Sequence, residues 1–252
     1  RSTLFPYTTL FRSARFVKYC VSGLRDVEIY SELDWEQFDA VDSAYKIREA
    51  EMFNIPACLD INNIDAIYIE GELNGILFCP KMAQCDAKQQ FLITTHELCH
   101  ALLGGCAGTS AVNAFIVEGE VELLAYAFTQ SLGIDLSIDQ LAYKNGVLAA
   151  LWLNELFGPG KIYRSLLDDD VDQLIDSIAG EGVCKDFNLA GYMTTENPDN
   201  KLALNAEIEI LCELSAKMGK SEIGEKWLEV FVQTFKKGEI DQSHMKKILS
   251  VN

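Results

Sequence analysis

Apolar residues recur at three- and four-residue steps through most of the chain from Gln90 onward, which is the period of an amphipathic helix. The same steps occur between Asp34 and about Phe53. Glycines follow several of these segments, as is typical of helix ends. The pattern predicts helices over residues 34–53, 90–103, 113–132, 138–157, 170–179, 200–218, 221–236 and 239–250.

Two short apolar segments ahead of residue 90 have a different pattern. Ala66–Ile69 and Gly75–Phe78 are rich in strand-forming residues, and Asn74-Gly75 between them suits a tight turn because both positions tolerate positive φ. This pattern predicts a β-hairpin. We therefore expect an α+β fold, mainly α, in which a small N-terminal sheet or hairpin packs on the next two helices and a helical bundle follows.

The first thirteen residues, 1–13, resemble a translated sequencing adapter through the stretch Pro-Tyr-Thr-Thr-Leu-Phe-Arg-Ser. We interpret this segment as an artefact, the alternative being an ordinary polar amino terminus, and expect the natural start to be missing. The predicted organisation is then a first domain over residues 14–133, which holds the strand-like segments and the next two helices, and a helical part over residues 134–252.

The charge and the cysteines restrict the class of protein. Lys and Arg number 21 against 38 Asp and Glu, for a net charge of −17, which argues against a nucleic-acid partner because neutralising phosphates needs clustered basic residues. The longest apolar run, 147–153, is far short of the roughly 18 residues that span a bilayer. Cys79, Cys99 and Cys212 lie in apolar patterns, which favours buried thiols and a cytoplasmic location over disulfides.

One motif carries chemistry. His96-Glu97-Leu98-Cys99-His100 has the pattern H-E-x-x-H. On a helix the two histidines share a face one turn apart, so both imidazoles can bind one Zn²⁺ at about 2.0–2.1 Å. Glu97 would then lie beside a water molecule bound to that ion. The alternative is an ordinary helix with core or surface histidines.

A catalytic zinc site needs three protein ligands. The remaining histidine, His244, lies in a polar tail, so we expect the third ligand from the helix at 113–132, which carries Glu118, Glu120 and Glu122. Glu118 and Glu122 share a face, whereas Glu120 points away from it. One of the first two could take the metal while the other accepts a hydrogen bond from a ligating imidazole. A solvated acidic helix face is the alternative, chiefly for Glu120.

The segment Glu118-Gly119-x-Val121-Glu122, which begins after seventeen intervening residues, resembles the gluzincin zinc peptidases. The stretch from His96 to about Gly180 is also similar to uncharacterised bacterial proteins regarded as metallopeptidases. The resemblance implies one Zn²⁺ held by His96, His100 and Glu118, with Glu97 as general base and Glu122 supporting an imidazole.

The chain also departs from the gluzincin pattern. The spacing is one residue shorter than in the aminopeptidase branch, and a Gly-x-Met-Glu-Asn segment for a free amine is missing. The resemblance does not say which tyrosine steadies the oxyanion, and four lie downstream: Tyr126, Tyr143, Tyr163 and Tyr192.

The sequence therefore predicts a zinc-dependent peptidase, an endopeptidase acting on a peptide or protein substrate. We expect an extended substrate to pair with a strand edge near Gly71–Phe78. Two alternatives remain: a catalytically idle, zinc-stabilised helical interaction module, and a narrow regulatory protease with one protein target. Glu97 favours catalysis, because a structural site needs no general base.

Overall fold

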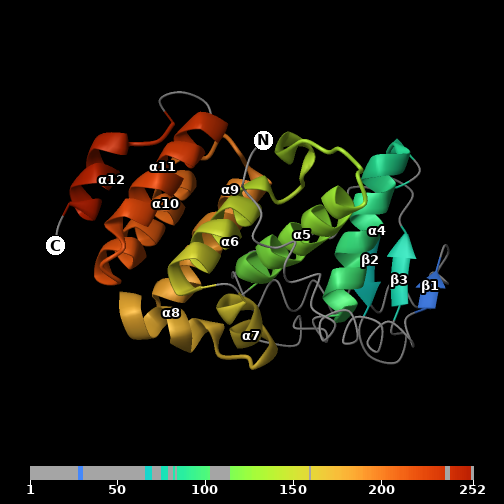
Figure 1. Cartoon of the computed structure of the whole chain (residues 1–252), viewed down its shortest axis with the longest axis horizontal. Coiled ribbons are helices and arrows are strands. Elements are labelled where there is room, and N and C mark those ends of the chain that lie inside the picture. The colour runs from blue at the N-terminus through green and yellow to red at the C-terminus, as the bar shows by residue number, and fades with distance from the viewer. Residues whose placement is uncertain are drawn as a thin grey trace. The chain divides into compact units, whose positions relative to one another are not determined.

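The computed structural model describes residues 28–30, 66–69, 75–78, 82, 84–102, 114–158, 160–235 and 239–250. Most regular elements in this part of the chain are helices (Figure 1). They are α4 (Ala87–Leu102), α5 (Ala114–Ser131), the 3₁₀ turn η5 (Ile138–Gln140), α6 (Lys144–Phe157), α7 (Lys161–Leu167), α8 (Val171–Ala179), α9 (Val183–Glu196), α10 (Lys201–Lys217), α11 (Ser221–Thr234) and α12 (Gln242–Leu249). The segment 1–13 and the helix predicted at 34–53 lie outside the described residues.

Three strands of three or four residues accompany the helices: β1 (Glu28–Tyr30), β2 (Ala66–Ile69) and β3 (Gly75–Phe78). Their order is β1-β3-β2, with β1 parallel and β2 antiparallel to β3. Gly75 pairs with Ile69, and residues 70–74, which include Asn74 of the predicted turn, lie outside the described residues.

The α+β class expected from the sequence is wrong. Apart from these strands, each shorter than the usual five or six residues, every regular element in the described ranges is a helix. The largest fully buried side chains, Trp152, Phe187 and Phe231, all lie on helices. Segments this short bury too little surface to form a core layer, so the described part is a helical protein.

The pattern also missed two helices and misplaced the start of a third. The helix predicted at 138–157 begins at Lys144, after the separate turn η5. Helices α7 and α9 were not predicted. The first has only seven residues, and the second contains Gly191 and two adjacent threonines, which weaken helix propensity. Tertiary packing supplies what local propensity lacks.

The chain divides into two compact units, residues 1–111 with 124–140 and residues 112–123 with 141–252. In the second unit α5 and α6 come so close that a Cβ on Gly119 would lie 2.5 Å from the carbonyl oxygen of Gly146. The Asn188 side chain of α9 accepts a hydrogen bond from the backbone N–H of Ile116, at 3.1 Å. This bond satisfies one of the donors that the first turn of α5 leaves unpaired.

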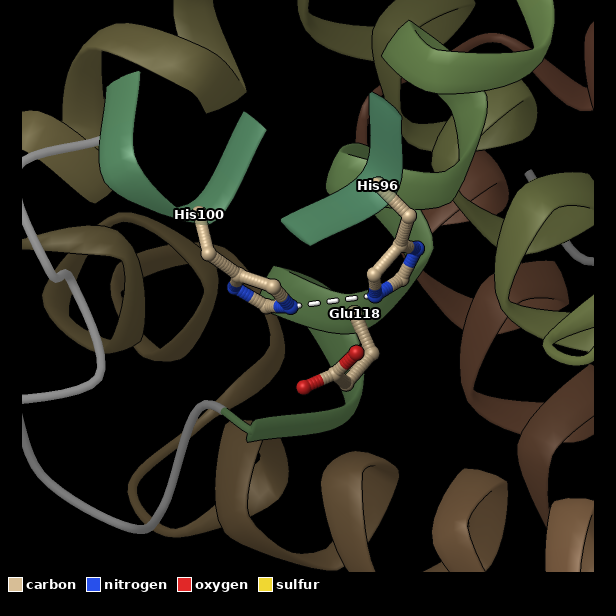
Figure 2. A group of neighbouring side chains, drawn as sticks. All are labelled: His96, His100 and Glu118. Carbon is tan, nitrogen blue, oxygen red and sulfur yellow. Dashed lines mark hydrogen bonds between the residues drawn. The ribbon is translucent and has the colours of Figure 1, made fainter. Parts of the chain in front are cut away.

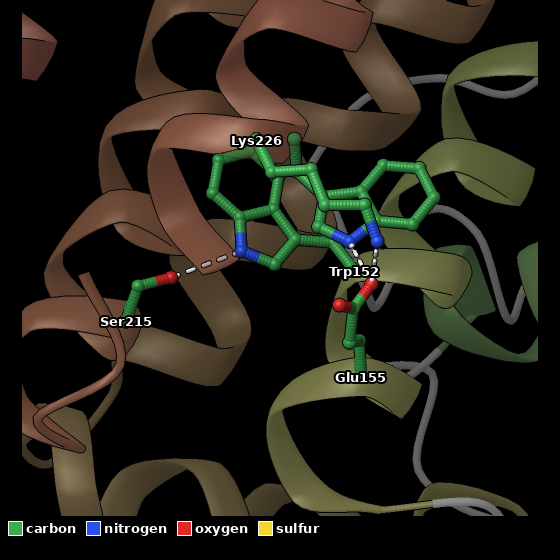
Figure 3. Close-up of polar contacts among 5 residues, drawn as sticks. Trp152, Glu155, Ser215 and Lys226 are labelled. Atoms are coloured by element: carbon green, nitrogen blue, oxygen red, sulfur yellow. Dashed lines mark hydrogen bonds and ion pairs between the residues drawn. The ribbon is translucent and has the colours of Figure 1, made fainter. Parts of the chain in front are cut away.

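Polar side chains also tie α6 to the later helices (Figure 3). The Trp152 indole N–H donates to Ser215 Oγ at 2.9 Å. One carboxylate oxygen of Glu155 accepts from both Trp227 Nε1 at 2.8 Å and Lys226 Nζ at 2.6 Å. Both buried indole N–H groups therefore have side-chain acceptors, the buried Ser215 for Trp152 and the exposed Glu155 for Trp227.

Two sequence expectations concern burial and length. Cys99 and Cys212 are buried thiols, as predicted, and Cys79 lies outside the described residues. Among the helices that the structure describes, none combines the length and apolar composition that crossing a bilayer requires.

Candidate metal centre

Helix α4 carries the two histidines of the H-E-x-x-H motif. It starts in a capping box: Asp86 Oδ1 accepts from the N–H groups of Lys88 and Gln89 at 2.9 Å each, and Gln89 Oε1 accepts from the Asp86 N–H at 3.2 Å. The Asp-x-x-Gln spacing was visible in the sequence and places the helix start at residue 87 rather than 90. The helix therefore has more than two turns ahead of His96.

Packing within the first unit fixes α4 against the C-terminal part of α5. The rings of Phe91 and Phe128 stack, with centroids 6.4 Å apart and planes 12° apart. Lys88 Nζ donates to the Asp135 carbonyl at 3.1 Å. These contacts hold the part of α4 that precedes the motif.

His96, His100 and Glu118 form a group that could hold a metal ion (Figure 2). One ligand atom from each lies within 4.8 Å of the others, and the two Nε2 atoms are 3.0 Å apart. His96 is buried and the other two side chains are partly exposed. Two imidazole nitrogens and a carboxylate oxygen are a donor set that Zn²⁺ and other first-row divalent ions accept, so the residues fit such an ion. All three residues were predicted from the sequence.

Glu97, the predicted general base, is only 8% exposed. Its Oε2 accepts a hydrogen bond from the backbone N–H of Tyr68, in strand β2, at 2.6 Å. A bond this short to a carboxylate is typical of charge-assisted hydrogen bonds. Sequence spacing gave no sign of this contact, because the two residues are 29 positions apart.

Glu120 does not lie on a solvated acidic face, so that alternative is wrong. The residue is 1% exposed, and its Oε1 accepts a hydrogen bond from Asn154 Nδ2. Burial raises the pKa of this carboxyl to about 8, against a smaller lowering by the bond to Asn154. Glu120 therefore belongs to the helical core, and its burial there favours the neutral form of the carboxyl.

Glu122 is also buried, and its Oε1 accepts a hydrogen bond from the backbone N–H of Ala142 at 3.2 Å. The carboxylate thus helps to hold the segment that leads into α6. Support of an imidazole by Glu122 stays a prediction. Neither Glu120 nor Glu122 belongs to the metal-binding group found among the described residues.

The other predicted residues lie as follows. Tyr126 is buried, and its hydroxyl donates to the Leu136 carbonyl at 3.1 Å. The other three tyrosines lie on or next to later helices: Tyr143 immediately before α6, Tyr163 on α7 and Tyr192 on α9. His244 Nε2 lies 3.1 Å from Glu209 Oε1, so the third histidine has a different partner from the motif.

The strand edge predicted to receive a substrate needs correction. Strand β3 lies between β1 and β2, so residues 75–77 have paired neighbours on both sides. Residues 71–74 lie outside the described part. Among the described strands, β2 lies at one edge of the sheet, and its Tyr68 N–H donates to Glu97 of the motif helix.

Comparison with known protein families, with curated proteins and with solved structures finds no match for this chain. Any function assigned to the protein must therefore follow from its own residues.

Proposed function

We propose that the protein is a zinc-dependent peptidase that cleaves within a peptide or protein chain. The observation that carries this proposal is the convergence of His96, His100 and Glu118 beside the buried carboxylate of Glu97. The gluzincin-like pattern of the same residues supports an amide as the substrate.

A bound divalent ion with an open coordination position lowers the pKa of water and polarises a carbonyl group. The protein's own contribution is proton transfer. Glu97 accepts a proton from the attacking water and delivers it to the departing amine, so that the peptide bond breaks without release of a free amide anion. A buried carboxylate with one oxygen already hydrogen-bonded is suited to this task, because its second oxygen has a restricted set of orientations.

The retained carboxylate favours an enzyme over an idle interaction module. A structural zinc site uses four protein ligands and no general base. The group found in the described residues has three ligand side chains, the number typical of catalytic sites.

Two assays on the purified protein and its Glu97→Gln variant test the proposal. The first measures the bound metal, and the second measures hydrolysis of a peptide library. We expect about one zinc per chain in both proteins and a loss of hydrolysis of roughly 10²–10⁴-fold in the variant. Glu196→Gln, at an exposed position on α9, is the matched control and should keep both properties. Absence of zinc from the wild-type protein defeats the proposal.

The same experiment separates the alternatives. An idle module binds zinc, gains thermal stability from it and hydrolyses no peptide. A narrow regulatory protease leaves the library intact but cleaves one protein in a cell extract, and Glu97→Gln abolishes that cleavage.

A further inference from the structure

We infer that the backbone N–H of Tyr68, in strand β2, positions the Glu97 carboxylate for catalysis. This inference rests on the proposed function and adds a positioning residue to it. The N–H donates to Glu97 Oε2 and so restricts the orientation of the whole carboxylate.

The contact is specific enough to fix an orientation. A glutamate side chain on a helix has three rotatable bonds, whereas a strand N–H has a fixed direction. The 2.6 Å bond between Tyr68 N and Glu97 Oε2 connects an acceptor on α4 with a donor outside that helix. Because Glu97 is only 8% exposed, little water is present to replace this donor.

The sheet topology explains why this donor is available. Tyr68 lies opposite Ile76 in the antiparallel pair, and residues along such a pair alternate between those that exchange ladder bonds and those that do not. The Tyr68 N–H donates to Glu97, so it points away from β3, and the N–H of Ile69 points toward β3. The strand therefore holds Glu97 without losing a ladder bond.

The clean test replaces Tyr68 by its α-hydroxy analogue, which turns the preceding amide into an ester and removes only the N–H. With a fluorogenic peptide chosen from the library, we expect kcat to fall about 10–100-fold, because misplacing a catalytic group by about 1 Å has effects of this order. KM and the bound zinc should stay within about twofold of wild type. An unchanged kcat overturns the inference.

Proline variants provide a second route. Tyr68→Pro removes the same N–H at an edge position, where proline is tolerated, and should retain zinc while losing kcat. Ile69→Pro is the comparison variant. It removes a ladder bond to β3 in place of the contact with Glu97, and we expect it to perturb the strand itself. If Tyr68→Pro keeps full kcat, the positioning role is refuted.

Thermal unfolding of the metal-free protein tests the contact independently of enzymatic activity. The ester should lower Tm by about 4 °C in the wild-type background, as expected for loss of a hydrogen bond to a charged group, and by about 1 °C or less in Glu97→Gln. Equal shifts in both backgrounds mean that Tyr68 does not act through Glu97, which overturns the inference. If the shifts differ but the wild-type protein hydrolyses nothing, the contact stands and the proposed function fails, and the catalytic role fails with it.

Discussion

The close approach of α5 and α6 makes Gly119→Ala an informative substitution, because Gly119 directly follows the predicted ligand Glu118. A Cβ at this position would lie 2.5 Å from the carbonyl oxygen of Gly146 and 2.8 Å from its carbonyl carbon. Real Cβ atoms essentially never come within 3.0 Å of a heavy atom from another part of the chain. Both atoms belong to backbone, so no side chain can turn aside and the helices must separate by about 0.5 Å or more.

The expected magnitude combines two opposing effects. Overpacking of a tight contact costs about 1–3 kcal/mol, and this backbone clash belongs at the upper end. Replacing glycine by alanine inside a helix returns about 1 kcal/mol. We expect a net destabilisation of about 2 kcal/mol, which lowers Tm by roughly 4–8 °C in a chain of this size. Because the same shift displaces Glu118, zinc affinity should fall by about tenfold.

Thermal unfolding followed by circular dichroism, and zinc titration of the metal-free protein, measure both effects. Gly146→Ala is the control, because its Cβ would lie 3.1 Å from Gly119 Cα and 3.4 Å from a ring carbon of Phe115. We expect its stability to stay within about 1 kcal/mol of wild type, since the gain in helix propensity offsets the milder clash. A Gly119→Ala protein as stable as Gly146→Ala would refute the reasoning.

Three further predictions concern the helical core. Burial raises the pKa of Glu207 from its ordinary 4.5 to about 8, so the folded chain keeps a proton that the unfolded chain releases. The free energy of unfolding should therefore fall as pH rises from about 4.5 to 8, by up to about 1.4 kcal/mol per pH unit. Denaturant titrations at several pH values should show a weaker pH dependence of this free energy for Glu207→Gln than for wild type, and an equal pH dependence in both proteins contradicts the prediction. Ser215→Ala leaves the buried Trp152 N–H without its acceptor and should cost about 1–3 kcal/mol in urea unfolding, so a neutral result would count against that bond. Lys226→Ala removes an exposed ion pair and should cost about 1 kcal/mol or less, whereas Glu155→Ala also removes the acceptor of a buried indole and should cost more; equal losses would contradict the assignment.

Part of the candidate metal centre could be predicted from the local sequence pattern of the helix that carries the H-E-x-x-H motif. The four-residue spacing of His96 and His100 places both imidazoles on one face of any helix, so their convergence follows from helical geometry alone. The same logic left Glu118 and Glu122 as candidates on the next amphipathic segment, and the gluzincin resemblance selected Glu118. The structure brings these three side chains together as predicted.

Other features needed the tertiary structure, because they depend on partners far away in the chain. Glu120 has the sequence environment of a surface acid, yet it is buried in the helical core, where it accepts a hydrogen bond from Asn154, 34 residues later, and where burial raises the pKa of its carboxyl. The fold class failed for a related reason: strand-like residues at 66–69 and 75–78 form only short strands, while α7 and α9 gain helical structure from packing that their composition does not reveal.

The sequence by itself indicated the helical period and the shared face of His96 and His100, since both depend on spacing within a helix. Only the tertiary structure decided which acidic residues are buried and which backbone donor holds Glu97. Burial and long-range hydrogen bonds depend on what packs against a residue, and the spacing of residues along the chain does not record it.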